Sequence, residues 1–367
     1  KEMNKLGLTD VYLDDKCYLY GKLPATKGYE NCPAIGFIAH MDTVSDFCDH
    51  EIRPMVTENY DGGDLVLGTS GLVLSPKEFP HLTGLKGHTL LTSDGTTILG
   101  ADDKAGIAEI LTMIERIQTE NRPHGMICVA FTPDEEIGMG AEHFNLDQFG
   151  AEYAYTLDGD SEGEIQYENF NACKAEFEIR GFNVHPGEGK DTMINASLVA
   201  IEINNCLPSM ETPRGTEDYE GFYHLISMQG EVGEAKLNYI VRDHDKNGFE
   251  ERKKTLRLIE KNLNAKWGEG TVTLKITDQY LNMKEIVEEH MHLIDHAKKA
   301  CEAAGVAPLI LPIRGGTDGC QLSFKGLPCP NLGTGGHAFH GPYEHISVEG
   351  MEKSVELLLA LIQEYTK

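Results

Sequence analysis

Short apolar runs alternate with a helical pattern in the first part of the chain. Residues 34–39 (AIGFIA), 126–131 (MICVAF) and 153–157 have the continuous apolar character of strands that are buried on both faces. Residues 104–117 instead place apolar side chains at the spacing of one helix face. Buried strands with an intervening helix predict an α/β domain, with a mixed sheet and helices on both of its faces.

After about Tyr167 the pattern changes to polar–apolar alternation, which is typical of half-buried antiparallel strands. The predicted order is strand, helix, strand, strand, helix, strand, over residues 173–180, 195–206, 223–231, 235–242, 248–264 and 271–277. This order predicts an α+β domain of the split βαβ type, with a four-stranded sheet and two helices.

Helical patterns return at residues 284–303 and 348–365. We therefore predict that the middle segment, residues 168–281, is a domain inserted into the first one. The first domain would be discontinuous and would consist of residues 1–167 and 282–367.

The amino-acid composition limits the kinds of molecule that this protein can bind and the compartment in which it can lie. The chain carries 59 acidic residues against 32 basic ones, a net charge of −27. Such a surface repels phosphate groups, so nucleic acids and anionic membranes are poor partners. The longest strongly apolar run, residues 357–362, is far shorter than the ~20 residues that span a bilayer. Nine cysteines without CxxC spacing predict reduced thiols and a cytoplasmic location.

Side chains that can bind metals follow the first predicted strand. His40 and Asp42 lie two positions apart, so both face the same side of an extended chain. In one interpretation His40 binds a metal while Asp42 holds its other ring nitrogen. In the other they are a loop histidine and a capping aspartate, and the two residues alone do not separate these interpretations.

Acidic motifs lie at the start of the next predicted helix and after the next predicted strand. In GADDKAG, residues 100–106, Asp102 and Asp103 begin a helix, where the helix dipole alone favours acids. An aspartate between such small neighbours can also bridge two ions. In PDEEIG, residues 133–138, consecutive acids form either a solvated turn or a site where one glutamate binds an ion and its neighbour is a general base.

Two further motifs complete the set. LDGD places Asp158 and Asp160 after the 153–157 strand, and GGHAFHGPYE places His337 and His340 far downstream. Each motif alone is compatible with a turn. Four of the five motifs end a strand of one predicted domain, and this coincidence favours a shared metal site.

Taken together, HMDT, GADDKAG, PDEEIG, LDGD and HAFHGPYE resemble the motifs of the M20 family of di-zinc peptidases. The resemblance is greatest to the family's tripeptide aminopeptidase branch. It extends from about Ile35 to the end of the chain and includes the inserted domain, which would be a lid. We expect the first few tens of residues usual in the family to be absent from this sequence.

The resemblance implies metal ligands divided between two zinc ions: His40 and Asp158 for one, Glu136 and His340 for the other, and Asp102 as a bridge. It also implies that Asp42 orients His40 and that Glu135 is the general base. Four neighbouring residues would not be ligands: Asp103, Asp134, Asp160 and His337.

The implied centre is electrically balanced, because the formal charges of two Zn²⁺ ions, three carboxylates and a bridging hydroxide sum to zero. Its imidazole and carboxylate donors suit zinc, and also cobalt or manganese. The ions would polarise the scissile carbonyl and share the hydroxide, while Glu135 passes the proton to the leaving amine.

Further substrate contacts are implied outside the metal centre. His185 would reach the substrate oxyanion, or else is a histidine of a surface loop. Arg242 and Arg314 are candidates for binding the peptide carboxylate in a bidentate manner, although surface ion pairs explain them equally well. Closure of the lid would limit the substrate to short peptides, and an exposed edge strand of the lid could pair in a homodimer.

The same scaffold would also serve a related dipeptidase, carboxypeptidase or N-acyl amino acid deacylase. One sequence does not separate these from an aminopeptidase. A metal-dependent binding protein without turnover is a different class of function, and the presence of Glu135 together with every implied ligand argues against it.

Overall fold

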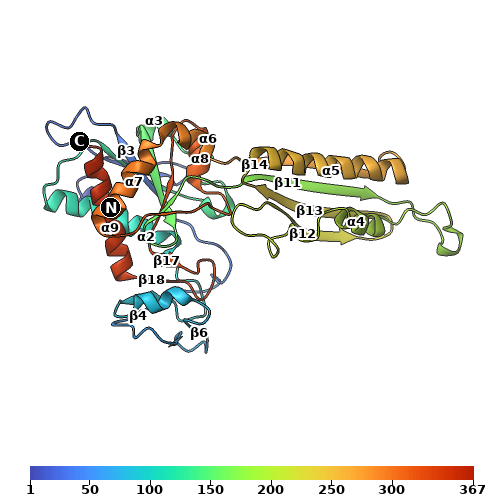
Figure 1. Ribbon diagram of the computed structural model, residues 1–367, viewed down its shortest axis with the longest axis horizontal. Coiled ribbons are helices and arrows are strands. Elements are labelled where there is room, and N and C mark those ends of the chain that lie inside the picture. Colours follow the sequence, from blue (N-terminus) through green and yellow to red (C-terminus); the bar gives the residue numbers. More distant parts are fainter. The chain divides into compact units, whose positions relative to one another are not determined.

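The computed structural model describes residues 1–367, which divide into two units (Figure 1). Unit 1 contains Lys1–Tyr167, Met283–Leu311 and Thr317–Lys367, and unit 2 contains Glu168–Asn282 and Pro312–Gly316. The last of these segments was predicted to be part of the first domain. It groups with unit 2 because Ile313 pairs with Asn169 and donates its N–H to the Glu168 carbonyl (2.8 Å).

Unit 1 is built on an eight-stranded sheet in the order β1-β2-β8-β3-β9-β16-β10-β15. The strands are, in chain order, Thr9–Leu13 (β1), Leu19–Leu23 (β2), Ile35–His40 (β3), Ile127–Thr132 (β8), Tyr153–Gly159 (β9), Glu164–Gln166 (β10), Leu309–Ile310 (β15) and Asn331–Gly333 (β16). Parallel pairing joins β8, β3, β9 and β16, whereas β2 and β10 pair with this group in the antiparallel sense. The predicted mixed sheet is therefore confirmed, and the carboxyl ends of β8, β3 and β9 meet at one edge.

Helices cover both faces of this sheet, as predicted. Helix α2 (Ala101–Thr119) packs on β3 and β9 and also contacts α9 (Val348–Glu364). Helix α9 in turn contacts α7 (His292–Ala304). On the other face, α3 (Leu146–Phe149) contacts β2 and β8, and α8 (Asp318–Phe324) contacts β9. The side chains of Tyr20, Ile38, Phe149 and Leu322 fill the core beneath these two short helices.

Helix α2 approaches β9 very closely at Gly106. A Cβ atom at this position would lie 2.3 Å from the Leu157 carbonyl oxygen and 2.5 Å from Asp103 Oδ1. Both neighbours are firmly placed, one by the sheet and one by burial, so only glycine fits. This contact sets the height of the start of α2 above the carboxyl end of β9.

Several small elements of unit 1 were not predicted. A second sheet has the order β17-β18-β7-β4, and β5 and β6 form a two-stranded ribbon. These strands are Met55–Thr57 (β4), Leu65–Val66 (β5), Val73–Leu74 (β6), Leu90–Thr92 (β7), Gly336–His337 (β17) and His345–Ser347 (β18). The remaining helical turns are Glu2–Lys5 (α1), Pro80–Leu85 (η1) and Lys284–Val287 (α6), and the last is separated from α7 by the 3-10 turn Glu288–His290 (η4). The single helix predicted over residues 284–303 is thus interrupted.

Unit 2 has an antiparallel sheet in the order β12-β13-β11-β14. Its elements are Asn171–Arg180 (β11), Ala196–Asn205 (α4), Phe222–Gly230 (β12), Glu234–Asp243 (β13), Lys246–Trp267 (α5) and Val272–Tyr280 (β14). In β11 the side chains of Ala175 and Phe177 are buried under α4 and α5, whereas Lys174 and Glu178 on the other face are exposed. The alternation in the sequence has produced the predicted split βαβ arrangement.

Two further features concern the cysteines and the helices of the whole chain. All nine cysteines are free thiols. None of the helices combines the length and apolar character that crossing a lipid bilayer requires.

Candidate metal centre

The strands of unit 1 bring the first implied ligands to one edge of the sheet. His40 is the last residue of β3, Asp158 lies next to the end of β9, and Glu136 is in a short 3-10 turn that follows β8. Asp102 is in the first turn of α2, and His340 is in the loop between β17 and β18. His40, Glu136 and Asp158 thus share one region because parallel strands end together, and α2 and the β17–β18 loop bring Asp102 and His340 to the same region.

Asp102 lies between two histidine–carboxylate groups. Its Oδ1 atom is 2.7 Å from His40 Nε2, and its Oδ2 atom is 2.9 Å from His340 Nε2. His40 Nε2 is also 3.4 Å from Asp158 Oδ1, and His340 Nε2 is 3.2 Å from Glu136 Oε2. The five side chains therefore form two triads that share one carboxylate, which is the arrangement implied by the resemblance.

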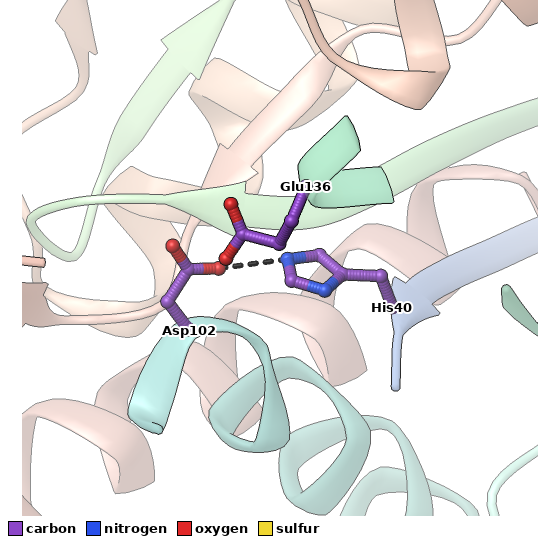
Figure 2. A group of neighbouring side chains, drawn as sticks. All are labelled: His40, Asp102 and Glu136. Atoms are coloured by element: carbon purple, nitrogen blue, oxygen red, sulfur yellow. Dashed lines mark hydrogen bonds and ion pairs between the residues drawn. The ribbon is translucent and has the colours of Figure 1, made fainter. Parts of the chain in front are cut away.

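Figure 2 shows how His40, Asp102 and Glu136 point toward one another from three different elements. One potential donor atom from each of these residues lies within 4.8 Å of the others, and the same holds for His40, Glu135 and Asp158. Donor atoms at such separations can reach a common cation after small adjustments.

The electrostatics of the cluster fit divalent cations. Glu136 Oε1 is buried without a hydrogen-bond partner, which is costly for a carboxylate unless a cation meets it. Burial raises the pKa of Asp158 to about 6, even though its contact with His40 acts in the other direction. Burial lowers the pKa of His40, but hydrogen bonds to Asp102, Asp158 and Asp42 outweigh it and raise the pKa well above the usual range. The site attracts positive charge, and its imidazole and carboxylate donors suit zinc, cobalt or manganese.

Glu135 is the carboxylate best placed to act beside such ions. Burial, followed by the charges of Asp158 and Asp318, raises its pKa well above the ordinary glutamate value. A raised pKa favours transient retention of a proton. Glu135 also lies in one of the two donor groups, with His40 and Asp158.

Asp42 connects His40 to the turn that carries both glutamates. Its Oδ1 atom is 3.4 Å from His40 Nδ1, and its backbone carbonyl is 3.1 Å from the same nitrogen. Its two carboxylate oxygens accept the backbone N–H groups of Glu135 and Glu136, each at 3.1 Å. Asp42 therefore fixes the orientation of an imidazole and the position of the glutamate turn at once.

The implied substrate-binding residues belong to unit 2. His185 is exposed in the loop that follows β11, and its Nδ1 accepts the Gly187 N–H (3.2 Å). Arg242 is buried and donates to the Cys173 and Val241 carbonyls, and Arg314 donates to the Asp218 and Glu220 carbonyls. Both guanidinium groups also donate to a side-chain oxygen, that of Gln279 for Arg242 and that of Thr216 for Arg314.

The sequence interpretation did not assign a role to three buried acids near the centre. Asp103 accepts the His40 N–H (3.0 Å), Asp318 accepts the Thr132 hydroxyl (2.8 Å), and Glu344 accepts backbone N–H groups ahead of α2. Asp103 and Glu344 occur in the motifs that were considered, whereas Asp318 does not, and the partners of all three are backbone groups or a hydroxyl. Such contacts depend on tertiary structure and have no pattern in the sequence.

Comparisons with known proteins identify the family and the fold of this chain. The sequence pattern of "Peptidase family M20/M25/M40" matches residues 94–364. A peptidase T from Caldanaerobacter subterraneus subsp. tengcongensis is 51% identical over 371 residues, which cover all of this chain and 90% of the relative. An aminopeptidase PepT from Bacillus cereus has a TM-score of 0.79 and 26% identity, and the match covers all of this chain and 91% of that one. A tripeptidase from Staphylococcus aureus shares the fold, with a TM-score of 0.80 and 22% identity over all of this chain and 90% of that one.

Both the matched pattern and the high identity extend over most of the chain, and they include the region that supplies the candidate ligands from Asp102 onward. The chain therefore belongs to the peptidase family M20/M25/M40, and its fold and enzyme class are those of the peptidase T group within that family.

Proposed function

We propose that this protein is a metal-dependent aminopeptidase that removes the amino-terminal residue of tripeptides. The observation that carries the proposal is the position of Asp102, which offers one carboxylate oxygen to each of two histidine–carboxylate groups. Hydrolases that hold two cations around a shared carboxylate activate water for attack on a peptide carbonyl. The similarity to an aminopeptidase supports the same reaction class.

The proposed cofactor is a pair of zinc ions, with cobalt or manganese as substitutes that suit the same donors. One ion would be held by His40 and Asp158, the other by Glu136 and His340, and Asp102 would be common to both. When bound, the ions supply polarisation of the scissile carbonyl and a lowered pKa of water.

Residues of the chain itself would accept and donate the protons of the hydrolysis reaction. Glu135 would accept a proton from water and deliver it to the leaving amine, and its raised pKa supports both transfers. Asp42 would keep the carboxylate of Glu135 in place through the hydrogen bond to the Glu135 N–H. His40 would remain neutral as a ligand, with its Nδ1 directed at Asp42.

Residues of unit 2 would complete substrate binding. We propose that His185 donates a hydrogen bond to the oxyanion of the tetrahedral intermediate, since its Nε2 is not engaged by the Gly187 contact. Arg242 and Arg314 would bind the peptide carboxylate. For this role they would use guanidinium N–H groups other than those that donate to backbone carbonyls.

The proposed partners are short peptides and a second copy of the chain. Strand β12 is an edge of the unit 2 sheet and has exposed Ile226 and Met228, and α4 of the same unit has exposed Leu198 and Ile201. An exposed strand edge with apolar neighbours can pair with its symmetry mate and form a homodimer. The nine free thiols fit a reducing compartment, which supports a cytoplasmic location.

The test combines metal analysis with a substrate panel. The purified chain should contain close to two zinc ions and should release the first residue of unblocked tripeptides faster than it cleaves dipeptides. A related dipeptidase, carboxypeptidase or N-acyl amino acid deacylase would be identified by the opposite preference. Cleavage of N-acetyl amino acids without cleavage of free tripeptides would reject the aminopeptidase proposal.

A further inference from the structure

Glu344 connects the two parts of the metal centre that do not lie on the main sheet. Its side chain is buried, with 1% exposure, at the end of the loop that carries His340. Its Oε2 atom accepts the N–H groups of Leu99 (2.6 Å) and Gly100 (2.8 Å), and its Oε1 atom accepts the N–H of Asp102 (3.0 Å). One carboxylate thus receives three backbone hydrogen bonds from the segment that leads into α2.

These hydrogen bonds determine where Asp102 lies. The first N–H groups of a helix have no partner within the helix, so an acceptor from elsewhere fixes the position of that end. Gly100 has a φ of 76°, which glycine adopts without strain, and its N–H is directed at Glu344. The backbone of Asp102 is therefore held by Glu344, while the side chain of Asp102 remains free to face the two histidines.

The same residue is also part of the His340 loop, which its backbone helps to close. Glu344 follows His340 by four positions, and its N–H donates to the Gly341 carbonyl (3.1 Å), which closes the loop into a turn. His340 itself is 53% exposed and has a φ of 62°, so packing contributes little to its position. His40 is different, because it is 2% exposed and belongs to a central strand.

We propose that Glu344 is a positioning residue that holds the Asp102 turn and the His340 loop at the separation which the second cation requires, without binding that cation. The proposal rests on the two-cation centre proposed above. In this proposal, different parts of the structure hold the two halves of the centre in place. The His40 half is fixed by the sheet, and the His340 half is fixed by one buried carboxylate.

The test is a zinc titration of the metal-free, full-length chain by competition with a chromophoric chelator, which yields two dissociation constants. Glu344→Gln keeps the size of the side chain, but its amide group cannot accept from both Asp102 and the Leu99–Gly100 pair. We expect the dissociation constant of one zinc step to rise by about 10- to 100-fold, the usual effect of removing a group that orients a ligand. The other step should weaken less, because Asp102 is the only one of its three proposed ligands that Glu344 holds.

Two further variants identify the affected step and control for the substitution. His340→Ala should abolish the same step, and in that background Glu344→Gln should have no additional effect on the remaining constant. Glu349→Gln is the matched control, because Glu349 Oε2 accepts a single backbone N–H, that of Thr89 (2.8 Å), and should leave both constants unchanged.

Each outcome decides the matter. Equal weakening of both steps, or no weakening, would overturn the positioning role while leaving the two-cation centre intact. A wild-type chain that binds fewer than two zinc ions would reject the proposed centre and the inference with it. If Glu344→Gln does not fold, as judged by circular dichroism, Glu344→Asp keeps the charge but withdraws it by one methylene, and it should weaken the same step selectively.

Discussion

His81 and His345 face each other with their Nε2 atoms 2.8 Å apart. His345 Nδ1 lies 2.7 Å from the Tyr343 carbonyl, so this nitrogen carries the proton and Nε2 of His345 accepts from His81. The contact therefore requires a neutral His345 ring, because a protonated ring has no free nitrogen with which to accept. Burial lowers the pKa of each ring, and it brings that of His345 to about 4.

This relationship predicts acid sensitivity of the metal-free fold. The folded pKa of His345 lies below its unfolded value, so the stabilisation it provides is present above about pH 6.5 and is lost as the pH falls toward 4. We expect His345 to account for ~2 kcal/mol of lost unfolding free energy between pH 7 and pH 5. The free energy of unfolding can be measured at each pH by urea unfolding in the presence of a chelator. His345→Gln should show a shallower pH dependence of this free energy than wild type, and the exposed control His50→Gln should not. Identical slopes for His345→Gln and wild type would contradict this origin.

The buried pair of Thr132 and Asp318 predicts a stability effect. Asp318 Oδ1 has no partner, and the Thr132 hydroxyl is the hydrogen-bond donor to Oδ2. Thr132→Val should therefore destabilise the protein by about 1–3 kcal/mol, because it leaves a buried carboxyl group unsatisfied. The free energy of unfolding is measured in guanidinium. Thr119→Val, on an exposed turn of α2, is the matched control and should lower this free energy much less. Equal losses would show that the buried hydrogen bond is not the cause.

Glu135 should be needed for turnover and not for metal retention. We expect Glu135→Gln to keep close to two zinc ions per chain and to lose about 10²- to 10⁴-fold in kcat, since a general base is removed while the ligands remain. Elemental analysis and steady-state kinetics on the same sample measure both quantities. Loss of one zinc ion together with the activity would instead make Glu135 a ligand, an assignment that its place among the donor groups allows.

Removal of metal should abolish activity reversibly. Dialysis against a chelator is expected to reduce tripeptide hydrolysis to background, and added zinc should restore it. Metal that binds only the folded chain also stabilises it, by about 2.7 kcal/mol at a concentration 100 times Kd, so Tm should rise on reconstitution. Full activity in a preparation shown to be free of metal would exclude the proposed mechanism.

The sequence predicted the parts of the structure that local chemistry controls. Residues 34–39 and 126–131 are apolar enough to be central strands, and each carries a polar motif at its carboxyl end, so His40 and Glu136 could be placed at one sheet edge. The roles of Arg242 and Arg314 could not be judged in this way. Their acceptors are carbonyl groups of other segments, and every residue offers a carbonyl.

The small sheet formed by β4, β7, β17 and β18 was missed for a related reason. Its strands are two or three residues long, which is too short for a period of two to be recognised. Yet this sheet brings the His340 loop beside the segment ahead of α2. The acceptor role of Glu344 depends on that pairing, so a single sequence predicts the ligand His340 but not the group that locates it.

The absence of a side chain at Gly106 has a consequence for how this protein can vary. Asp102 lies four positions before this glycine on α2, and Asp158 directly follows Leu157, the residue whose carbonyl the glycine touches. One added carbon atom would push the helix away from the strand, and the two aspartates would separate with it. The separation of these two candidate ligands thus depends on the missing methyl group of Gly106, a residue that is not itself a candidate ligand.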